Sequence, residues 1–238
     1  MRVMTKMTFH EDLTAALQKA SASRLSRRRM MGGSLKLAAG GAAVALISPA
    51  AFGFRSAVAQ DFEGPIDVLN YALTLEHLEA TFYRTYNDEF GESDFGDYDD
   101  NVYSRLVQIG EHETTHVDTL VSVITDLGGE PVEEAMYDFG VTDVDSYVAT
   151  AAVLENLGTG AYTGAAQFLI EEDELLTAAL TIHGVEARHA SYLNFLNGEV
   201  PFPDSFETAL SPAEVLEAAT PLIVMVTEMP DTGTGPGN

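Results

Sequence analysis

The sequence predicts an all-α protein centred on a four-helix bundle, with a long crossover between the second and third helices and a short helix near the C-terminus. Three observations lead to this fold class. Apolar residues recur at spacings of three and four along four long segments. No strand-like alternation of polar and apolar residues competes with this pattern. Glutamate, tyrosine and histidine also follow the same order twice, which indicates that the two halves of the bundle repeat each other.

The first helix is expected from Pro65 to Phe90, because apolar residues such as Leu69 and Leu73 share one face. Gly64 followed by proline suits its start, since proline is favoured at the first helical position. The acidic stretch at residues 87–101 is expected to be a solvated loop, with a cation-binding loop as the less favoured alternative. The remaining helices are expected over residues 102–127, from a cap at Asp143 or Asp145 to about 168, over 171–197 and over 212–222. Residues 130–142 then form the crossover.

Two of the expected helices carry a glutamate followed three residues later by a histidine. These pairs are Glu113 with His116 and Glu186 with His189. Residues three apart project from one face of a helix, so each pair could hold a metal ion from one side. A single Glu-x-x-His on an acidic helix is usually a surface pair, but its repetition in register favours a metal site.

The other two helices each carry a glutamate followed seven residues later by a tyrosine: Glu76 with Tyr83, and Glu155 with Tyr162. Seven residues is close to two helical turns, so each tyrosine is expected to lie over its own glutamate. Both tyrosines could hydrogen-bond a ligand glutamate, or they could be ordinary core rings. Glu79 shares the face of Glu76 and could replace it as a ligand or support it, although the tyrosine spacing favours Glu76.

Together these elements predict a centre for two divalent metal ions. The six candidate ligands are Glu76, Glu113, His116, Glu155, Glu186 and His189. Carboxylates and imidazoles suit iron, manganese or zinc, and the chain has no cysteine that could supply a thiolate. Two Glu-x-x-His helices and two single-glutamate helices form the pattern of di-iron or di-manganese bundles. The alternative is that these acids face solvent and the two histidines pack at the rim.

The other histidines allow further interpretations. His112 to His116 also spells His-Glu-x-x-His, the zinc protease helix, in which both histidines bind zinc. This interpretation is less favoured, because it needs a third ligand and leaves the second Glu-x-x-His unexplained. His77 is expected in the core or at the surface, and His183 could support Glu186.

The charge is strongly uneven along the chain. Residues 1–59 hold nine of the 12 basic residues and two of the 37 acidic ones. The rest therefore has three basic and 35 acidic residues, a formal charge of −32. Such a surface repels itself less in concentrated salt, where the Debye length falls from about 10 Å to about 3 Å, and we infer a salt-loving host. Nucleic acid is excluded as a partner, because binding phosphates needs lysine and arginine.

Residues 1–59 are expected to be a twin-arginine signal peptide. Arginines at positions 27–29 precede an uncharged run at 37–51, and Ala57-Val58-Ala59 offers a cleavage site. A retained membrane anchor is the less favoured alternative, since glycine, serine and proline interrupt the short apolar run. We therefore expect export to the cell surface or beyond with no stable membrane span after cleavage, a bundle over 60–200, and an extension over 201–238 with a short helix and a disordered tail.

The ordered motifs also resemble a known family. Glu76 and Glu79 within residues 73–83, Glu113-Thr114-Thr115-His116, Glu155 within 151–162, and Val185-Glu186-Ala187-Arg188-His189 look like the ferritin-like domain of the desiccation-related protein family, within the ferritin and rubrerythrin superfamily. The resemblance covers roughly residues 64–197. It implies a four-helix bundle with terminal ligands at Glu76 and Glu155 and bridging carboxylates at Glu113 and Glu186.

These inferences lead to one functional expectation and one alternative. We expect an exported protein with a dinuclear metal centre, iron before manganese, that serves in oxidative or desiccation stress as an oxidoreductase. Its small-molecule partners would be oxygen, peroxide or ferrous iron, and a homodimer would be compatible with the sequence. The alternative is a metal-free structural or protective bundle without catalytic activity.

Overall fold

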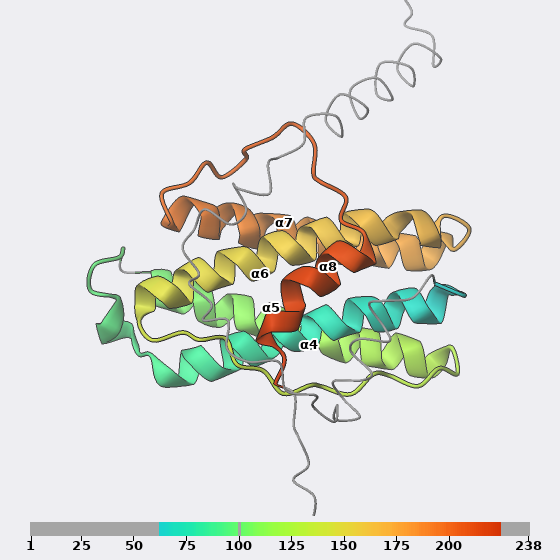
Figure 1. Cartoon of the computed structure of the whole chain (residues 1–238), viewed down its shortest axis with the longest axis horizontal. Coiled ribbons are helices and arrows are strands. Elements are labelled where there is room, and N and C mark those ends of the chain that lie inside the picture. The colour runs from blue at the N-terminus through green and yellow to red at the C-terminus, as the bar shows by residue number, and fades with distance from the viewer. Residues whose placement is uncertain (1–61, 100, 225–238) are drawn as a thin grey trace, which may run out of the picture.

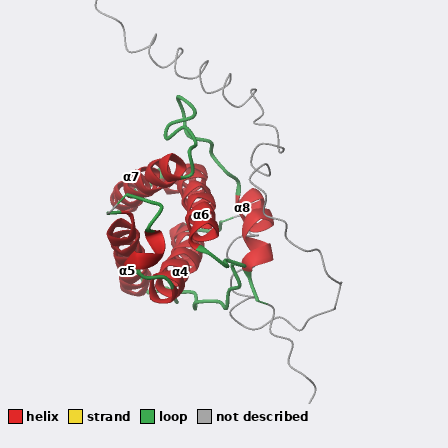
Figure 2. Cartoon of the chain, turned by 90° about the vertical axis from the view of Figure 1, so that its left-hand side faces the viewer, coloured by secondary structure: helices red, strands yellow, loops and turns green. Residues whose placement is uncertain are grey.

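The computed structural model describes residues 62–99 and 101–224, so the expected signal peptide and the tail after residue 224 lie outside the described residues. The bundle consists of four long helices, α4 (Pro65–Glu89), α5 (Val102–Asp126), α6 (Val144–Ala165) and α7 (Asp173–Leu196) (Figure 1). Viewed from one end, they form a ring, and α8 (Pro212–Ala219) lies outside it beside α6 (Figure 2). The predicted all-α fold class is confirmed.

The helices begin where their capping residues place them. Gly64 is the N-cap of α4 and Pro65 is its first residue, as predicted. Of the two candidate caps of α6, Asp143 is the one used: its side chain accepts a hydrogen bond from Ser146 N at 2.8 Å. The third helix was expected to reach residue 168, but α6 ends at Ala165 and continues as the short 3₁₀ helix η2 (Ala166–Leu169).

The acidic stretch between α4 and α5 is more ordered than predicted. Its first residues still belong to α4, and the 3₁₀ helix η1 (Glu92–Phe95) follows. The side chain of Phe95 is buried, and its ring lies 5.6 Å from that of Tyr103 and 6.2 Å from that of Tyr147. The described acidic side chains of this stretch are exposed, as expected of a solvated loop, but the aromatic side chain of Phe95 anchors the segment to the core.

The helices pack in two pairs, α4 with α5 and α6 with α7, and the pairs meet where α4 lies against α6. Helices α4 and α6 run in opposite directions (Figure 1). The predicted crossover joins the pairs and is fixed to α4 by Asn70, whose side chain bonds Glu130 O and Val132 N at 3.1 and 2.8 Å. The two halves are thereby held in one orientation around a shared interior.

The segment after α7 also packs on the bundle. Leu210 N donates to Gly160 O at 2.9 Å, and Leu210 lies directly against Gly160 and Gly164 of α6. Two glycines on one helical face leave no side chain between the two backbones, so the segment can approach closely. Further along, Tyr137 of the crossover forms an antiparallel bridge with Ile223.

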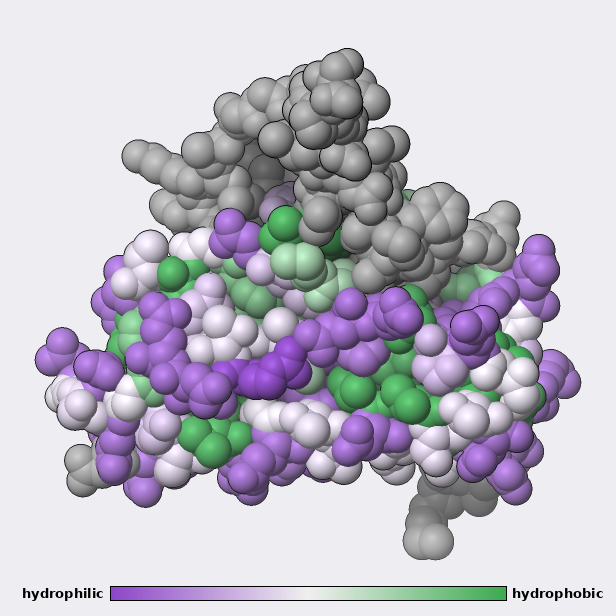
Figure 3. Space-filling view, turned by 90° about the horizontal axis from the view of Figure 1, so that it is seen from below, coloured by the Kyte–Doolittle hydropathy of each residue, from purple (hydrophilic) through white to green (hydrophobic). Residues whose placement is uncertain are grey.

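The described residues bury two apolar clusters in the interior. The larger one is rich in aromatic side chains and includes Tyr83, whereas the smaller one includes Leu73, Leu120 and Tyr162. Hydrophilic side chains occupy much of the face shown in Figure 3, with smaller apolar patches between them. None of the helices within the described residues is both long and apolar enough to cross a membrane.

Candidate metal centre

Six side chains of the four long helices meet in the interior between the two apolar clusters. They are Glu76 on α4, Glu113 and His116 on α5, Glu155 on α6, and Glu186 and His189 on α7. The four glutamates are fully buried and the two histidines nearly so. The structure therefore brings together all six residues that the sequence spacing singled out.

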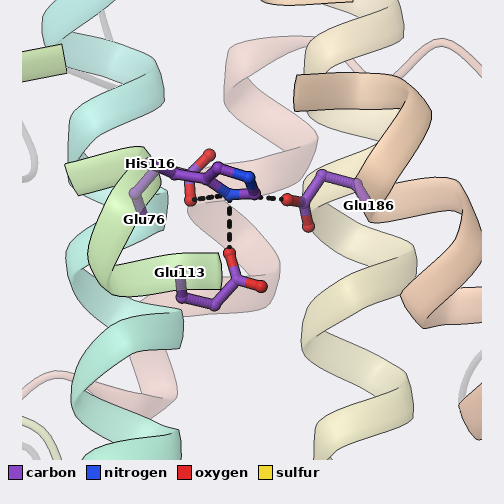
Figure 4. Close-up of side chains that lie close together, drawn as sticks. All are labelled: Glu76, Glu113, His116 and Glu186. Atoms are coloured by element: carbon purple, nitrogen blue, oxygen red, sulfur yellow. Dashed lines mark hydrogen bonds and ion pairs between the residues drawn. The ribbon is translucent and has the colours of Figure 1, made fainter. Parts of the chain in front are cut away.

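The first group of ligand-type atoms surrounds the imidazole of His116 (Figure 4). Its Nδ1 lies 2.9 Å from Glu113 Oε2, 3.2 Å from Glu76 Oε2 and 3.1 Å from Glu186 Oε1. One ring nitrogen carries at most one hydrogen, so it cannot satisfy three carboxylates by hydrogen bonding. Donor atoms bound at about 2.1 Å to one ion lie at similar distances from each other, so the spacing fits a shared cation.

The second group repeats this arrangement around His189. Its Nδ1 lies 3.0 Å from Glu113 Oε1 and 3.2 Å from Glu155 Oε2, and Glu186 completes the group. Glu113 and Glu186 thus belong to both groups, whereas Glu76 and Glu155 belong to one each. This distribution fits two ions that share two carboxylates.

Several oxygens of the cluster lack a hydrogen-bond partner among the described residues. They are Glu113 Oε1 and both carboxylate oxygens of Glu186. The histidines come close to two of these oxygens, but the direction of approach is not that of a hydrogen bond. Buried, unpartnered carboxylate oxygens are costly unless a cation neutralises them, so the residues fit a divalent metal.

The burial and close spacing of these side chains shift the pKa values of the glutamates and histidines in the cluster. Burial, followed by repulsion from Glu186, raises the pKa of Glu113 from 4.5 to about 7. Burial and neighbouring carboxylates likewise raise the pKa of Glu155 and of Glu186. Burial lowers the pKa of both histidines, but their hydrogen bonds to carboxylates outweigh it, so the pKa of His116 rises to about 12 and that of His189 to about 10. Without metal, the cluster holds protons that a cation would displace.

The two tyrosines contact the cluster in a crossed manner. Tyr83 Oη donates to Glu155 Oε1 at 2.6 Å, and Tyr162 Oη donates to Glu76 Oε1 at 2.5 Å. The prediction that both tyrosines could hydrogen-bond a candidate ligand glutamate is confirmed, but neither bonds the glutamate of its own helix. Each instead supports the glutamate of the other helix, α6 for Tyr83 and α4 for Tyr162.

Glu79 is a fifth buried carboxylate beside the cluster. Burial, followed by Glu186, raises its pKa well above the ordinary value. It belongs to neither group of converging ligand atoms, whereas Glu76 belongs to one. A Cβ at Gly158, three residues after Glu155, would lie 2.7 Å from Glu79 Oε1. The second half of the repeat thus has a glycine where the first has Glu79, and this glycine makes room for the extra carboxylate.

The contact between His112 and His189 was not predicted from the sequence. His112 Nδ1 lies 2.9 Å from His189 Nε2, and the two rings stack with their centroids 5.2 Å apart. The position of His112 four residues before His116 was the available signal, although it did not reveal the partner on α7. Since His112 belongs to neither ligand group, the zinc protease interpretation gains no support.

The remaining histidines lie outside the ligand groups. His183 Nε2 lies 2.9 Å from Thr163 Oγ1, and this is the hydrogen bond of its side chain, rather than one to Glu186. His77 Nε2 lies 3.1 Å from Val132 O of the crossover. These two side chains therefore help to fix helices and crossover in place.

The helical part of the chain also matches a known protein family. The family model described as "Ferritin-like domain" matches residues 64–199, which include the four long helices and all six converging residues. No curated protein matches the chain.

Proposed function

The chain belongs to the ferritin-like domain family, and we propose that its buried cluster binds two divalent metal ions, with iron favoured over manganese. The observation that carries this proposal is the sharing of Glu113 and Glu186 between the two groups of ligand atoms. One ion would be held by Glu76 and His116, the other by Glu155 and His189, and the two shared carboxylates would bridge them. The family resemblance of the sequence motifs implies the same division of roles.

The chemistry proposed for this centre is oxidoreduction. When bound, two ferrous ions can supply two electrons, which with two protons reduce oxygen to hydrogen peroxide, or hydrogen peroxide to two water molecules. The chain's own residues hold and orient the carboxylates: Tyr83 and Tyr162 fix Glu155 and Glu76 by hydrogen bonds. His112 fixes the ring of His189 from its outer side.

We propose that this activity serves protection against oxidative or desiccation stress outside the cytoplasm. The arginine-rich segment before the uncharged run at 37–51 supports export by the twin-arginine route. The formal charge of −32 after residue 59 supports a salt-rich setting. Resemblance to the desiccation-related proteins supports the stress role.

The metal content of the folded chain tests the proposal. We expect about two equivalents of iron or manganese in protein purified from concentrated salt. Substitution of both shared carboxylates, Glu113→Gln with Glu186→Gln, should remove most of this metal. Glu111→Gln with Glu174→Gln is the matched control, because it changes exposed glutamates of the same two helices.

The outcomes separate the proposal from its alternative. Metal lost in the buried double variant and kept in the exposed one supports a dinuclear centre, and oxygen and peroxide consumption by the loaded protein then tests the chemistry. A folded chain that takes up no metal on reconstitution rules out the oxidoreductase and leaves a metal-free protective bundle.

A further inference from the structure

A small apolar cavity lies beside the candidate metal centre, in the half of the bundle that contains Tyr162. All four long helices contribute to its wall, and its volume is about 40 Å³. One water molecule needs roughly 10–15 Å³ by this measure, so the cavity is large enough for a small molecule. On each helix the wall residue nearest in sequence to a candidate ligand is Leu75, Thr119, Ala161 or Ile182.

The cavity is adjacent to the ligand side chains. Leu75 directly precedes Glu76, and Ile182 lies one helical turn before Glu186. Tyr162 forms part of the wall while its hydroxyl donates to Glu76 at 2.5 Å. Tyr162 therefore connects the wall of the cavity directly to the carboxylate of Glu76.

The chemistry of the wall selects an uncharged, apolar guest. Of the lining side chains with polar atoms, Thr119 bonds the carbonyl of Thr115 and Tyr162 bonds Glu76. The hydroxyl of Tyr71 is the lining side-chain group without a partner in the described part of the chain. A buried water typically makes two to four hydrogen bonds, and hydrogen peroxide has more groups to satisfy, so both would be poorly accommodated. Oxygen needs no hydrogen bond.

The outer wall of the cavity reaches the surface between α5 and α7. Thr119 on α5 and Ala178 on α7 line the cavity and are exposed. Close packing joins α5 chiefly to α4 and α7 chiefly to α6, so the side between α5 and α7 is the less tightly packed one. This gives a small molecule a short route from solvent.

The interior is packed differently around the two tyrosines that support the candidate centre. Around Tyr83, the tyrosine of the other half, aromatic rings fill the interior: Phe82 lies 5.3 Å away and Tyr147 6.3 Å away, measured between ring centroids. Around Tyr162 the neighbours include the small side chains of Ala72, Ala161 and Ala165. The repeat thus has a packed side and an accessible side.

We propose that this cavity binds a small apolar molecule and, resting on the proposed function, that this molecule is oxygen approaching the Glu76 side of the centre. This assigns oxygen rather than hydrogen peroxide as the oxidant that the interior of the bundle is shaped to admit. It also assigns entry to the α5–α7 side.

Xenon tests the cavity independently of metal, because it is apolar and fits sites that oxygen fits. Crystals of the full chain equilibrated with xenon under pressure should show one atom among Ala72, Leu120 and Ile182. Ala179→Leu, at a partly exposed wall position, should displace it, and Ala72→Leu should do so from the buried side. Two variants on different helices keep the test valid if one fails to fold.

Kinetics then test the assignment to oxygen. In iron-loaded protein, Ala179→Leu and Thr119→Phe should slow iron oxidation by oxygen several-fold and leave oxidation by hydrogen peroxide nearly unchanged. Thr125→Phe is the matched control, since Thr125 is an exposed residue of α5 with the same kind of hydroxyl-to-backbone bond and lies outside the cavity wall.

The results distinguish two failures. Absence of xenon from the cavity overturns the inference, as does an equal slowing of both oxidants. Xenon in the cavity of a chain that loads no metal supports the apolar binding site and overturns the proposed function instead.

Discussion

Tyr83 Oη donates a hydrogen bond to Glu155 Oε1 at 2.6 Å, although Tyr83 lies on α4 and Glu155 on α6. The reciprocal bond joins Tyr162 to Glu76. Seven residues along one helix correspond to about 10.5 Å of rise, so each tyrosine and the glutamate of its own helix are separated by about two turns. Helices α4 and α6 are antiparallel (Figure 1), and the two hydrogen bonds show that each tyrosine reaches the glutamate of the neighbouring helix. The two bonds therefore connect the halves of the bundle through the candidate metal centre.

Removing either bond should weaken metal binding in one half of the centre. Tyr83→Phe removes the tyrosine hydrogen bond from Glu155, a candidate ligand, and Tyr162→Phe does the same to Glu76. Loss of such a supporting bond typically costs about 10- to 100-fold in metal affinity. Anaerobic calorimetric titration with ferrous or manganous ion should show one of two binding steps weakened in each variant.

Tyr71→Phe is the control for these substitutions. It removes a buried tyrosine hydroxyl from α4 that has no hydrogen-bond partner among the described residues, so both binding steps should persist. Equal weakening in all three variants would contradict specific support of the two glutamates.

The stability of the metal-free protein should fall as pH rises from about 5 to 7. The pKa of Glu113 is raised from 4.5 to about 7, mainly by burial and then by Glu186. Between these values the folded chain binds a proton that the unfolded chain has lost, so the free energy of unfolding decreases with rising pH. The pKa of His116 is raised from 6.5 to about 12. Between these values the folded chain keeps a proton on His116 that the unfolded chain has lost, so this group also lowers the free energy of unfolding as the pH rises above 6.5.

Urea unfolding in chelator and concentrated salt measures this dependence. Glu113→Gln should give a shallower decline, because it removes one of the titrating groups. Divalent metal should reverse the trend, since it competes with the same protons and binds more tightly as pH rises. A metal-free protein that becomes more stable across this window would rule out a protonated cluster.

Most of the fold was predictable because its signals are local. The apolar spacing located the long helices, Gly64-Pro65 located the start of α4, and the choice between Asp143 and Asp145 placed the start of α6 within two residues. Phe95 escaped prediction because a single aromatic residue among acids has no periodicity of its own. Its burial depends on Tyr103 and Tyr147, which approach it only once α5 and α6 are in place.

In the candidate site, too, contacts within one helix were predictable from the sequence, whereas contacts between helices were not. Residues three apart on one helix must share a face, so the spacing of the pairs at Glu113 and Glu186 was enough to indicate convergence. Partners on different helices depend on the direction in which those helices run. This is why the crossed tyrosines and the contact of His112 with His189 were not foreseen.

Gly164 should be required for docking of the segment before α8. A Cβ at this position would overlap the backbone carbonyl of Leu210. Gly164→Ala should therefore lower the free energy of unfolding by about 1–3 kcal/mol, despite the better helix propensity of alanine. Gly184→Ala on α7 is the control: its Cβ would meet nothing closer than Arg188 Nη1 at 4.0 Å, so we expect a gain of about 0.5–1 kcal/mol. Thermal unfolding of both variants measures these changes. Stabilisation by Gly164→Ala would contradict the close contact between Gly164 and the backbone of Leu210.

Gly158 and Glu79 should be energetically coupled. In an unobstructed helix interior, Gly→Ala contributes about 1 kcal/mol of stability. At Gly158 the new Cβ would displace the buried Glu79 carboxylate, whose Oε1 lies 2.7 Å from that position, so the gain should vanish or reverse in the otherwise unchanged chain. In a Glu79→Ala background the obstacle is gone and the gain should reappear. A double-mutant cycle by chemical denaturation should therefore give a coupling of at least about 1 kcal/mol. An identical effect of Gly158→Ala in both backgrounds would mean that Glu79 moves aside freely, and that the glycine is not what accommodates the fifth carboxylate.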